Sequence, residues 1–263
     1  MALLVVLWTL LLVGVVAAAL SGEARKQGLL ARNGVALARA EAAAEGGVVQ
    51  AVAALMDPRP EFRWAADGRV HRFVLDGVTV EVRIVDEAGK IDVNTGSTEL
   101  LAALLEVVGA SPQAAFAIAA DVAALRAGGR TGQPRGFETT SELLSIPGMT
   151  PPLFERIAPF VTVLTRARGV DPGVAPRPVL LALAARDPSA SPAGAPANEG
   201  APAVLPPGDF VTESQHSIYA IDAVGTLGQA AFIREAIVRL THNAETPFLV
   251  HTWSRLPAAP YRR

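Results

Sequence analysis

The chain opens with an uncharged apolar run that is long enough to cross a membrane. Met1–Leu20 reads MALLVVLWTLLLVGVVAAAL, and Thr9 is its only residue with a polar side chain. As an α-helix that rises about 1.5 Å per residue, the run would be about 30 Å long, which matches the hydrocarbon core of a bilayer. We therefore expect residues 1–20 to be a transmembrane segment and the rest of the chain to be held at a membrane surface.

Two other interpretations of this run are possible from the sequence. A secretory signal peptide is compatible with Ala17–Ala19, which resembles a small-residue cleavage site, but no basic region precedes the run. A buried core helix would normally show a polar stripe, which this run lacks. Basic residues then follow the run at Arg25, Lys26, Arg32 and Arg39. The positive-inside tendency would place them in the cytoplasm, whereas a basic leader upstream of Met1 would reverse that orientation.

The composition excludes several classes of site. The 263 residues include no cysteine, which excludes a disulfide framework, a thiolate zinc site and a cysteine nucleophile. The formal net charge of −2 gives no field that would attract nucleic acid to the chain as a whole. The length is sufficient for a membrane anchor with one or two modest domains.

We expect residues 21–57 to continue the same helix outside the membrane. No proline occurs from Ser21 to Met56, and Asp57–Pro60 (DPRP) ends the helix. Apolar residues recur in this stretch with a spacing typical of one half-buried helical stripe. They are Leu29, Leu30, Val35, Leu37, Val48, Val49, Val52 and Leu55.

Residues 62–89 have the pattern of a β-hairpin. Val70–Leu75 and Val78–Val85 are rich in β-branched residues, and Asp76-Gly77 between them favours a type I′ turn. In the second strand, valine and isoleucine alternate with polar residues, which describes a sheet with one covered face. We expect the preceding helix to be that cover.

Residues 90–185 predict an all-helical insert. Helix-start signals, either a capping Ser or Thr or a proline in the first turn, precede apolar segments at Ser97, Ser111, Thr140-Ser141 and Thr150. Residues 186–212 are rich in Pro, Ala, Gly and Ser and predict a flexible loop.

Strand patterns return in residues 213–255, and residues 256–263 form a tail. The candidate strands are Ile218–Val224, Ala231–Leu240 and Phe248–Trp253, with turns at Gly225–Gly228 and Asn243–Pro247. We expect Phe248 and Trp253 to pack in the sheet. The predicted fold class is therefore α+β: a long N-terminal helix packed on an antiparallel sheet, with a helical domain inserted between strands.

The chain resembles the minor pseudopilin K family of the bacterial type II secretion system, also called the general secretion pathway protein K family. The resemblance runs nearly from end to end. It rests on the segments MALLVVLWTLLLV, EAGKIDVNTGSTELLAALL, FETTSELLSIPGMTPPLFERIAPFVTV, GVDPGVAPRPVLLAL, IYAIDAVG, IREAIVRL and FLVHTWSR. The second to fourth of these are specific in combination.

The resemblance implies a type IV pilin-like fold and a place at the tip of the periplasmic pseudopilus. There the protein would initiate or cap the filament that drives export of folded proteins across the outer membrane. The implied partners are minor pseudopilins I and J, the pseudopilus and the inner-membrane assembly platform. The implied location is the cell inner membrane, crossed once, with the C-terminal domain in the periplasm.

The resemblance also assigns membrane insertion and assembly to the start of the chain. The residues concerned are Met1, Leu3, Leu4, Val5, Leu7 and Trp8. Most pilin-like subunits carry a Glu at mature position five that pairs with a neighbour's amine; if the mature chain starts at Met1, that position is Val5. A subunit that caps the filament does not need this carboxylate. The family's leader is absent from the given chain, so prepilin peptidase is an expected partner only if a leader precedes Met1.

No cofactor is expected, although some members of the family bind calcium through an acidic loop. The corresponding stretch here keeps Asp121 and Glu138 but lacks a run of carboxylates. Calcium takes six to eight oxygen ligands. Asp121 and Glu138 are therefore the candidates only if calcium is bound.

A membrane-anchored DNA-binding or DNA-uptake protein is the alternative function. SELLSIPGMTPPLFERI resembles a helix-hairpin-helix, with the turn at Ile146, Pro147 and Gly148. Such a turn grips phosphates only with nearby cations, yet Lys/Arg and Asp/Glu are equal in number between Lys90 and Arg168. We therefore favour a tight helix–helix turn and expect no nucleic-acid partner.

We expect no enzymatic activity. The histidines His71, His216, His242 and His251 show no metal-ligand spacing, and no nucleophile elbow or phosphate loop is present. Asp86 and Glu87 close a strand and are interpreted as solvated turn residues rather than a catalytic pair.

Overall fold

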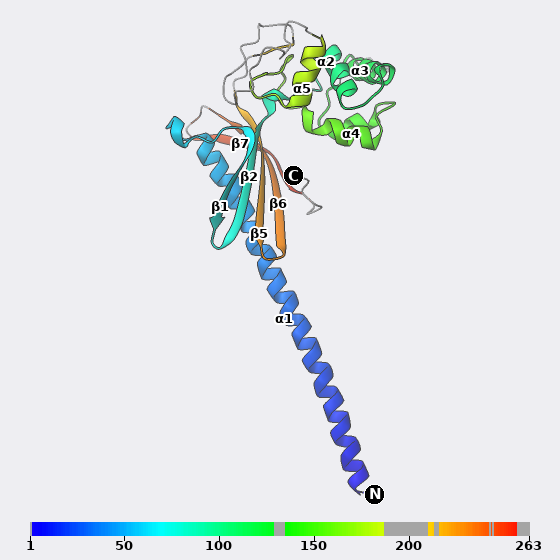
Figure 1. Ribbon diagram of the computed structural model, residues 1–263, viewed down its shortest axis with the longest axis vertical. Helices are drawn as coiled ribbons and strands as arrows, with labels where there is room; N and C mark the ends of the chain where they lie inside the picture. Colours follow the sequence, from blue (N-terminus) through cyan, green and yellow to red (C-terminus); the bar gives the residue numbers. More distant parts are fainter. Residues whose placement is uncertain are drawn as a thin grey trace.

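The computed structural model describes residues 2–128, 135–186, 210–212, 216–241, 243 and 245–256. Within the first helix, the side chains of Val5 and of residues 15–25 lie outside that description. The molecule is a long helical stalk with a head at one end, and the N-terminus lies at the far end of the stalk (Figure 1). The fold class predicted from the sequence is confirmed.

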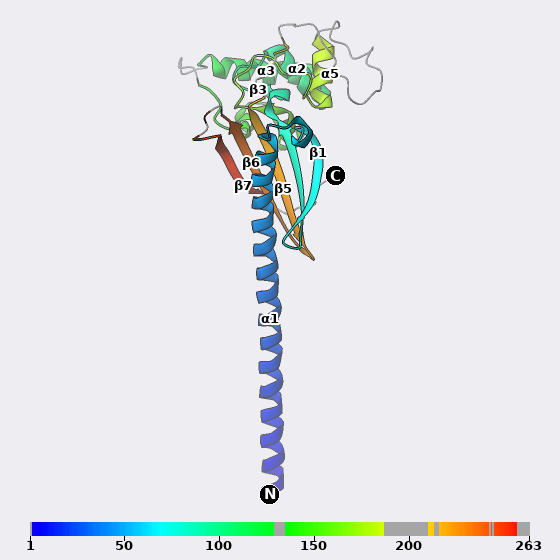
Figure 2. The ribbon, with the colours of Figure 1, turned by 90° about the vertical axis from the view of Figure 1, so that its left-hand side faces the viewer.

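Helix α1 (Ala2–Leu55) forms both the stalk and one layer of the head. It is followed by the one-turn 3-10 helix η1 (Pro60–Phe62). The C-terminal part of α1 packs on three strands of the sheet, β2, β5 and β6. Figure 2 shows α1 in front of the sheet.

The predicted apolar stripe of α1 is only partly correct. Val48, Val52 and Leu55 are buried, and Leu37 packs against this core. The larger residues Leu29, Leu30, Val35 and Val49 are exposed instead. The buried face consists mainly of the small residues Ala40, Ala43, Ala44 and Ala51. Small side chains let the helix backbone approach the sheet more closely than leucine would allow.

The sheet has five antiparallel strands in the order β1-β2-β5-β6-β7. They are β1 (Asp67–Leu75), β2 (Val78–Asp86), β5 (Ile218–Leu227), β6 (Ala230–Leu240) and β7 (Phe248–Leu256). Strands β1 and β2 form the hairpin expected from the sequence, and Asp76 and Gly77 have φ angles of 48° and 75°, as a type I′ turn requires. Along β2, alternate residues are fully buried under α1.

Gly225 was predicted to begin a turn, but it lies inside β5. The strand continues to Leu227, and the turn to β6 contains Gly228, whose φ is 60°. Gly225 faces α1 so closely that a Cβ at this position would lie 2.1 Å from the carbonyl oxygen of Ala40. The glycine is therefore required by helix–sheet contact and not by a turn.

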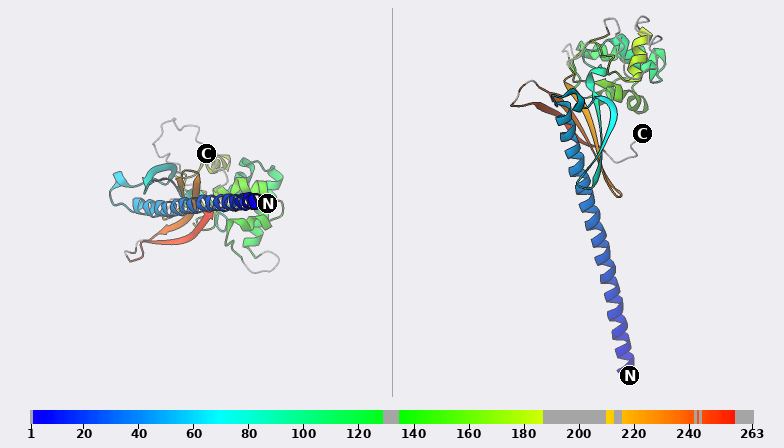
Figure 3. Two further views of the ribbon diagram at one scale, coloured as in Figure 1. Left: turned by 90° about the horizontal axis from the view of Figure 1, so that it is seen from below. Right: turned by 60° about the vertical axis from the view of Figure 1, so that its left-hand side comes forward.

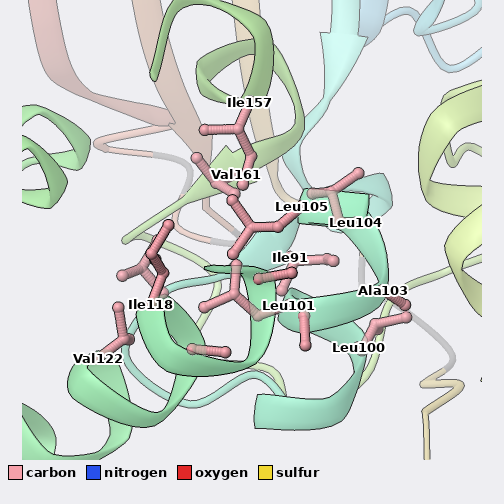
Figure 4. Close-up of a cluster of buried hydrophobic side chains, with 14 of the residues drawn as sticks. Ile91, Leu100, Leu101, Ala103, Leu104, Leu105, Ile118, Val122, Ile157 and Val161 are labelled. Atoms are coloured by element: carbon pink, nitrogen blue, oxygen red, sulfur yellow. The ribbon is translucent and has the colours of Figure 1, made fainter. Parts of the chain in front are cut away.

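The second part of the head is an α-domain, residues 87–217, inserted between the neighbouring strands β2 and β5. Its helices are α2 (Thr98–Val107), α3 (Pro112–Arg126), α4 (Pro151–Ile157) and α5 (Arg177–Arg186). Ser97, Ser111 and Thr150 accept hydrogen bonds from backbone N–H groups at the starts of α2, α3 and α4, as predicted. Apolar side chains of these helices form a core of their own (Figure 4).

The insert contains the predicted helices, but it is not entirely helical, and one predicted helix start differs from the structure. Two short strands, β3 (Ile91–Asp92) and β4 (Val161–Thr162), pair in parallel inside it. The segment after Thr139 is a 3-10 helix, η4 (Thr140–Ser145), in which Thr139 and Glu142 form the capping box. Further 3-10 turns are η2 (Glu87–Gly89) and η5 (Ala158–Phe160).

The boundaries of the predicted loop and tail also differ. Arg186 ends α5, and Phe210–Thr212 lie beside Gly169 and Val170, where the backbone N–H of Val170 donates to the Phe210 carbonyl at 2.9 Å. Leu256 belongs to β7. The rest of these predictions, residues 187–209 and 257–263, falls outside the described residues.

We predict that Gly225→Ala destabilises the head by about 1–3 kcal/mol, since the new methyl group overlaps the α1 backbone. The control is Gly34→Ala in α1, where nothing lies within 4 Å of the added Cβ. That control should leave stability unchanged or raise it by up to about 1 kcal/mol. Chemical denaturation of both variants in detergent measures the difference, and equal stabilities would contradict the close contact.

Candidate assembly surfaces

The N-terminal part of α1 is a stalk of exposed apolar side chains. They range from Val6 at 56% to Leu3 at 85% exposed. The set is Leu3, Leu4, Val6, Leu7, Trp8, Leu10, Leu11, Leu12 and Val13. Since successive helical residues turn by about 100°, this set surrounds the helix and leaves no polar face.

The one polar side chain of this segment is satisfied within the helix. The Thr9 hydroxyl donates to the carbonyl oxygen of Val6 at 2.8 Å. Apart from the indole N–H of Trp8, the described side chains of the stalk therefore need no hydrogen bond from water, which suits an apolar environment. Within the part of the chain that is described with its side chains, no helix is long and apolar enough to cross a membrane.

The structure describes the side chains of four of the six residues predicted to act in membrane insertion and assembly. Leu3, Leu4, Leu7 and Trp8 are exposed on the stalk. Met1 and the side chain of Val5 lie outside the described residues.

The α-domain lies at the opposite end of the molecule from the N-terminus (Figures 1 and 3). Its core and the helix–sheet core are two separate clusters of buried side chains. The chain enters it from the end of β2 and returns to the start of β5. Side chains at these two connections, after β2 and before β5, hold the α-domain in place on the sheet.

A group of charged side chains forms the joint at these connections. Asp86, at the end of β2, lies 2.7 Å from Nδ1 of His216, and Nε2 of His216 lies 3.5 Å from the Asp171 carboxylate. Glu87 pairs with Lys90, and both side chains are largely buried. The backbone N–H of Asp171 donates to the Ala88 carbonyl at 2.9 Å. The joint thus connects residues that are far apart in the sequence.

The interpretation of Asp86 and Glu87 as solvated turn residues is therefore wrong. Each residue is only 1% exposed. Burial raises the pKa of Asp86, while the Ala88 N–H and His216 lower it. Burial also raises the pKa values of Asp222 and Glu235 on the neighbouring strands. Lys90, the partner of Glu87, is only three residues away, but His216, the partner of Asp86, is 130 residues away and cannot be found from the local pattern.

Tyr219 completes the joint from β5. Its hydroxyl donates to the His216 carbonyl oxygen. Burial, together with the nearby charge of Asp86, raises the pKa of Tyr219 to about 12. Both effects favour the neutral hydroxyl in the folded state.

The predicted helix-hairpin turn is a packing feature in this structure. Ile146 is 4% exposed, the Met149 N–H donates to the Ile146 carbonyl at 3.1 Å, and Gly148 has a φ of 85°. Pro147 lies between them. An added Cβ at Gly148 would lie 3.4 Å from Ile118 of α3, so the turn is in contact with the α-domain core. From Ser145 to Leu153 the chain carries no Lys or Arg to face a phosphate.

The calcium candidates are not brought into a metal cluster by the described residues. Among these residues, no three His, Asp or Glu side chains are grouped so that they could hold a metal ion. Asp121 lies on α3, and Glu138 lies just before the capping box of η4. The stretch 129–134 between them is outside the described residues, so calcium at Asp121 and Glu138 stays a prediction.

Each of the described histidines contacts another side chain of the fold. The His71 ring stacks on Trp64, with 4.1 Å between ring centroids. His216 belongs to the joint, and Arg239 donates from Nε to Nε2 of His251 at 3.2 Å. His242 falls outside the described residues.

Phe248 and Trp253 belong to the sheet, as predicted, but they are not packed beneath other parts of the chain. Phe248 is 39% exposed and Trp253 is 43% exposed on the edge strand β7. Leu249 and Val250 beside them are also exposed. The apolar pattern identified the strand but not its position at the edge, where α1 does not cover it.

We predict that the stability of the protein falls as the pH rises from 10 towards 12, in part because of Tyr219. In this range the unfolded state loses the phenolic proton that the folded state keeps, so ionisation favours unfolding. Denaturant midpoints at pH 9 and pH 11 should differ less for Tyr219→Phe than for the unmodified chain. Identical pH dependence in the two proteins would contradict the assigned role of the hydroxyl.

Comparisons with known proteins agree with this architecture. No family model and no curated protein matches the chain. One solved chain that is similar belongs to the crystal structure of the GspK–GspI–GspJ complex from the type 2 secretion system of enterotoxigenic Escherichia coli. The TM-score is 0.58 at 13% identity, over 89% of this chain and 99% of that chain. The chain therefore has a GspK-like minor pseudopilin fold, as its sequence predicted.

Proposed function

We propose that this chain is a minor pseudopilin at the tip of a type II secretion pseudopilus. In this role it initiates or caps the filament that drives export of folded proteins across the outer membrane, and it acts as a structural component and not as an enzyme. The observation that carries the proposal is the joining of an exposed apolar stalk to a GspK-like head in a single helix, α1. The fold alone would leave the site of action open, but the stalk restricts it to apolar surroundings.

The N-terminal segment supports a location in the cell inner membrane. Met1–Leu20 carries no charge, and the side chains described at its start are apolar and exposed. Insertion of this segment would remove that surface from water, with the head in the periplasm. The assembly platform of the inner membrane then becomes the natural partner of the stalk.

The shape of the head supports a position at the tip. The α-domain lies above the sheet at the end opposite to the stalk (Figure 1), where a further subunit would have to stack. A subunit built in this way can end a filament, and its bulk obstructs further growth.

The partners proposed are minor pseudopilins I and J of the same system. The similar solved chain belongs to a complex whose members are GspK, GspI and GspJ. Because the fold is shared over most of both chains, an equivalent three-protein tip is the simplest assembly for this chain.

Replacing Leu7 with Asp should remove the protein from the membrane and block secretion. A charged residue at the centre of the span raises the insertion free energy by about 2.5–3.5 kcal/mol. Leu7→Ala is the matched control, since it shortens the same side chain without adding charge. Membrane fractionation and an assay of secreted protein measure both effects; wild-type secretion by Leu7→Asp would contradict the membrane-anchored role.

The full-length chain in detergent should co-purify with candidate I and J subunits of the same secretion system. The expected result is a complex containing one copy of each protein, measured by light scattering. Failure to bind either subunit, combined with tight and salt-sensitive binding of DNA in a gel shift, would favour the DNA-uptake alternative instead.

A further inference from the structure

The face of the sheet that carries α1 is covered unevenly at its two edges. Helix α1 approaches the sheet most closely at Gly225 of the central strand β5, and it also contacts β2 and β6. Figure 2 shows β1 on one side of α1 and β7 on the other. Among the described residues, the contacts of α1 with this face are mainly with β2, β5 and β6, and it reaches β1 near Leu75.

The chain itself covers β1. Trp64, in the connection from α1, stacks on His71 and lies 6.1 Å from the Phe73 ring, both on the α1 side of β1. Phe73 packs against the buried helix–sheet core. No described aromatic ring covers β7 in this way, although the Arg234 guanidinium lies 5.2 Å from the centroid of the Trp253 ring.

Four side chains of β7 form a bare row on the α1 side of the sheet. Cross-strand pairing shows their direction, since their partners on β6 face α1 or pack against its core. The row consists of Phe248, Val250, Trp253 and Arg255. Its apolar members are 39%, 48% and 43% exposed. We call these four residues the β7 row.

The distance from α1 to the β7 row fits a second helix. Neighbouring strands lie about 4.8 Å apart, so β7 lies two strands, or about 10 Å, from β5. Packed helices have axes about 8–10 Å apart. A helix that lies beside α1 on this sheet therefore rests on the β7 row. It also meets Val49, which is 63% exposed one turn beyond Glu45 on the flank of α1 that faces β6.

The charges at this position favour a partner with a carboxylate. Arg234 of β6 is already paired with Glu41 at 3.2 Å and with Glu45 at 2.5 Å. Arg255 lies over the Phe232 ring at 4.8 Å, and no described carboxylate forms an ion pair with it. The β7 row thus offers three apolar side chains followed by one available cation.

We propose that the β7 row docks an amphipathic α-helix of a neighbouring minor pseudopilin, with apolar side chains against Phe248, Val250 and Trp253 and a carboxylate against Arg255. This inference rests on the proposed function and identifies the surface by which the I or J subunit is held. The neighbour's helix completes the layer that α1 begins. It also shields an apolar edge strand that would otherwise be open to uncontrolled pairing.

The absence of cysteine makes the site directly testable by cross-linking. Val250→Cys in the full-length chain carries a photoreactive probe in the complex with the I and J subunits. Val74→Cys is the matched control, since it is 68% exposed on the opposite edge strand. Mass spectrometry should map the adducts from position 250 to a helix of the I or J subunit, and position 74 should give none there. Adducts to a partner strand, to a second copy of this chain, or to neither subunit in an intact complex would overturn the proposal.

Affinity measurements give an independent test. Trp253→Ala and Arg255→Glu should each weaken binding of the I and J subunits at least tenfold, whereas Val74→Ala should leave it unchanged. Replacing the partner carboxylate identified by cross-linking with Arg should restore binding to Arg255→Glu. Wild-type affinity in both β7 variants would overturn the docking site and leave the proposed function standing. Failure of the unmodified chain to bind would overturn both.

Discussion

The close contact between α1 and the centre of the sheet determines the rest of the architecture. At Gly225 the strand has no side chain, and the facing surface of α1 is built from alanines such as Ala40 and Ala44. Backbone is thereby brought against backbone along a narrow line over β5. A single helix can then belong to the head at one end and project as a bare stalk at the other. The same narrow contact leaves both edge strands outside the helix, so that each needs another cover.

The α-domain is added to this unit without disturbing it. It enters between β2 and β5, which are neighbours in the sheet and remain paired from Thr79–Asp86 to Tyr219–Thr226. The insertion replaces a hairpin turn and leaves the register intact. What fixes its orientation is the joint, in which His216 lies between carboxylates of β2 and of the α-domain. Buried carboxylates such as Asp86 and Glu87 are tolerated only when they are paired or hydrogen-bonded, so the contacts of the joint favour this placement of the α-domain.

The sequence predicted those parts of the structure that depend on local chemistry. The alternation of β2, the turn at Asp76-Gly77 and the serine caps of α2 and α3 each need only a few neighbouring residues. Prediction from the sequence failed where the structure of a residue depends on partners that are distant in the sequence. Alanine carries little hydrophobic signal, so the buried face of α1 was assigned to larger residues that are in fact exposed. Two-residue strands have no period to detect, and the burial of Asp86 depends on a histidine that follows the whole insert.

The same limit applies to the assembly surfaces, and it separates them into two kinds. The apolar stalk could be predicted from the sequence because its side chains are apolar on every side, whatever the fold. Such a surface has no preferred direction and can determine only that the subunit is held in an apolar layer. The β7 row has three apolar side chains and one cation on a single face, and its exposure follows only from the position of α1. A surface with a defined direction can select one neighbour at one angle. In the proposed role, the stalk would therefore determine where the subunit is held, and the β7 row would determine which neighbour it binds.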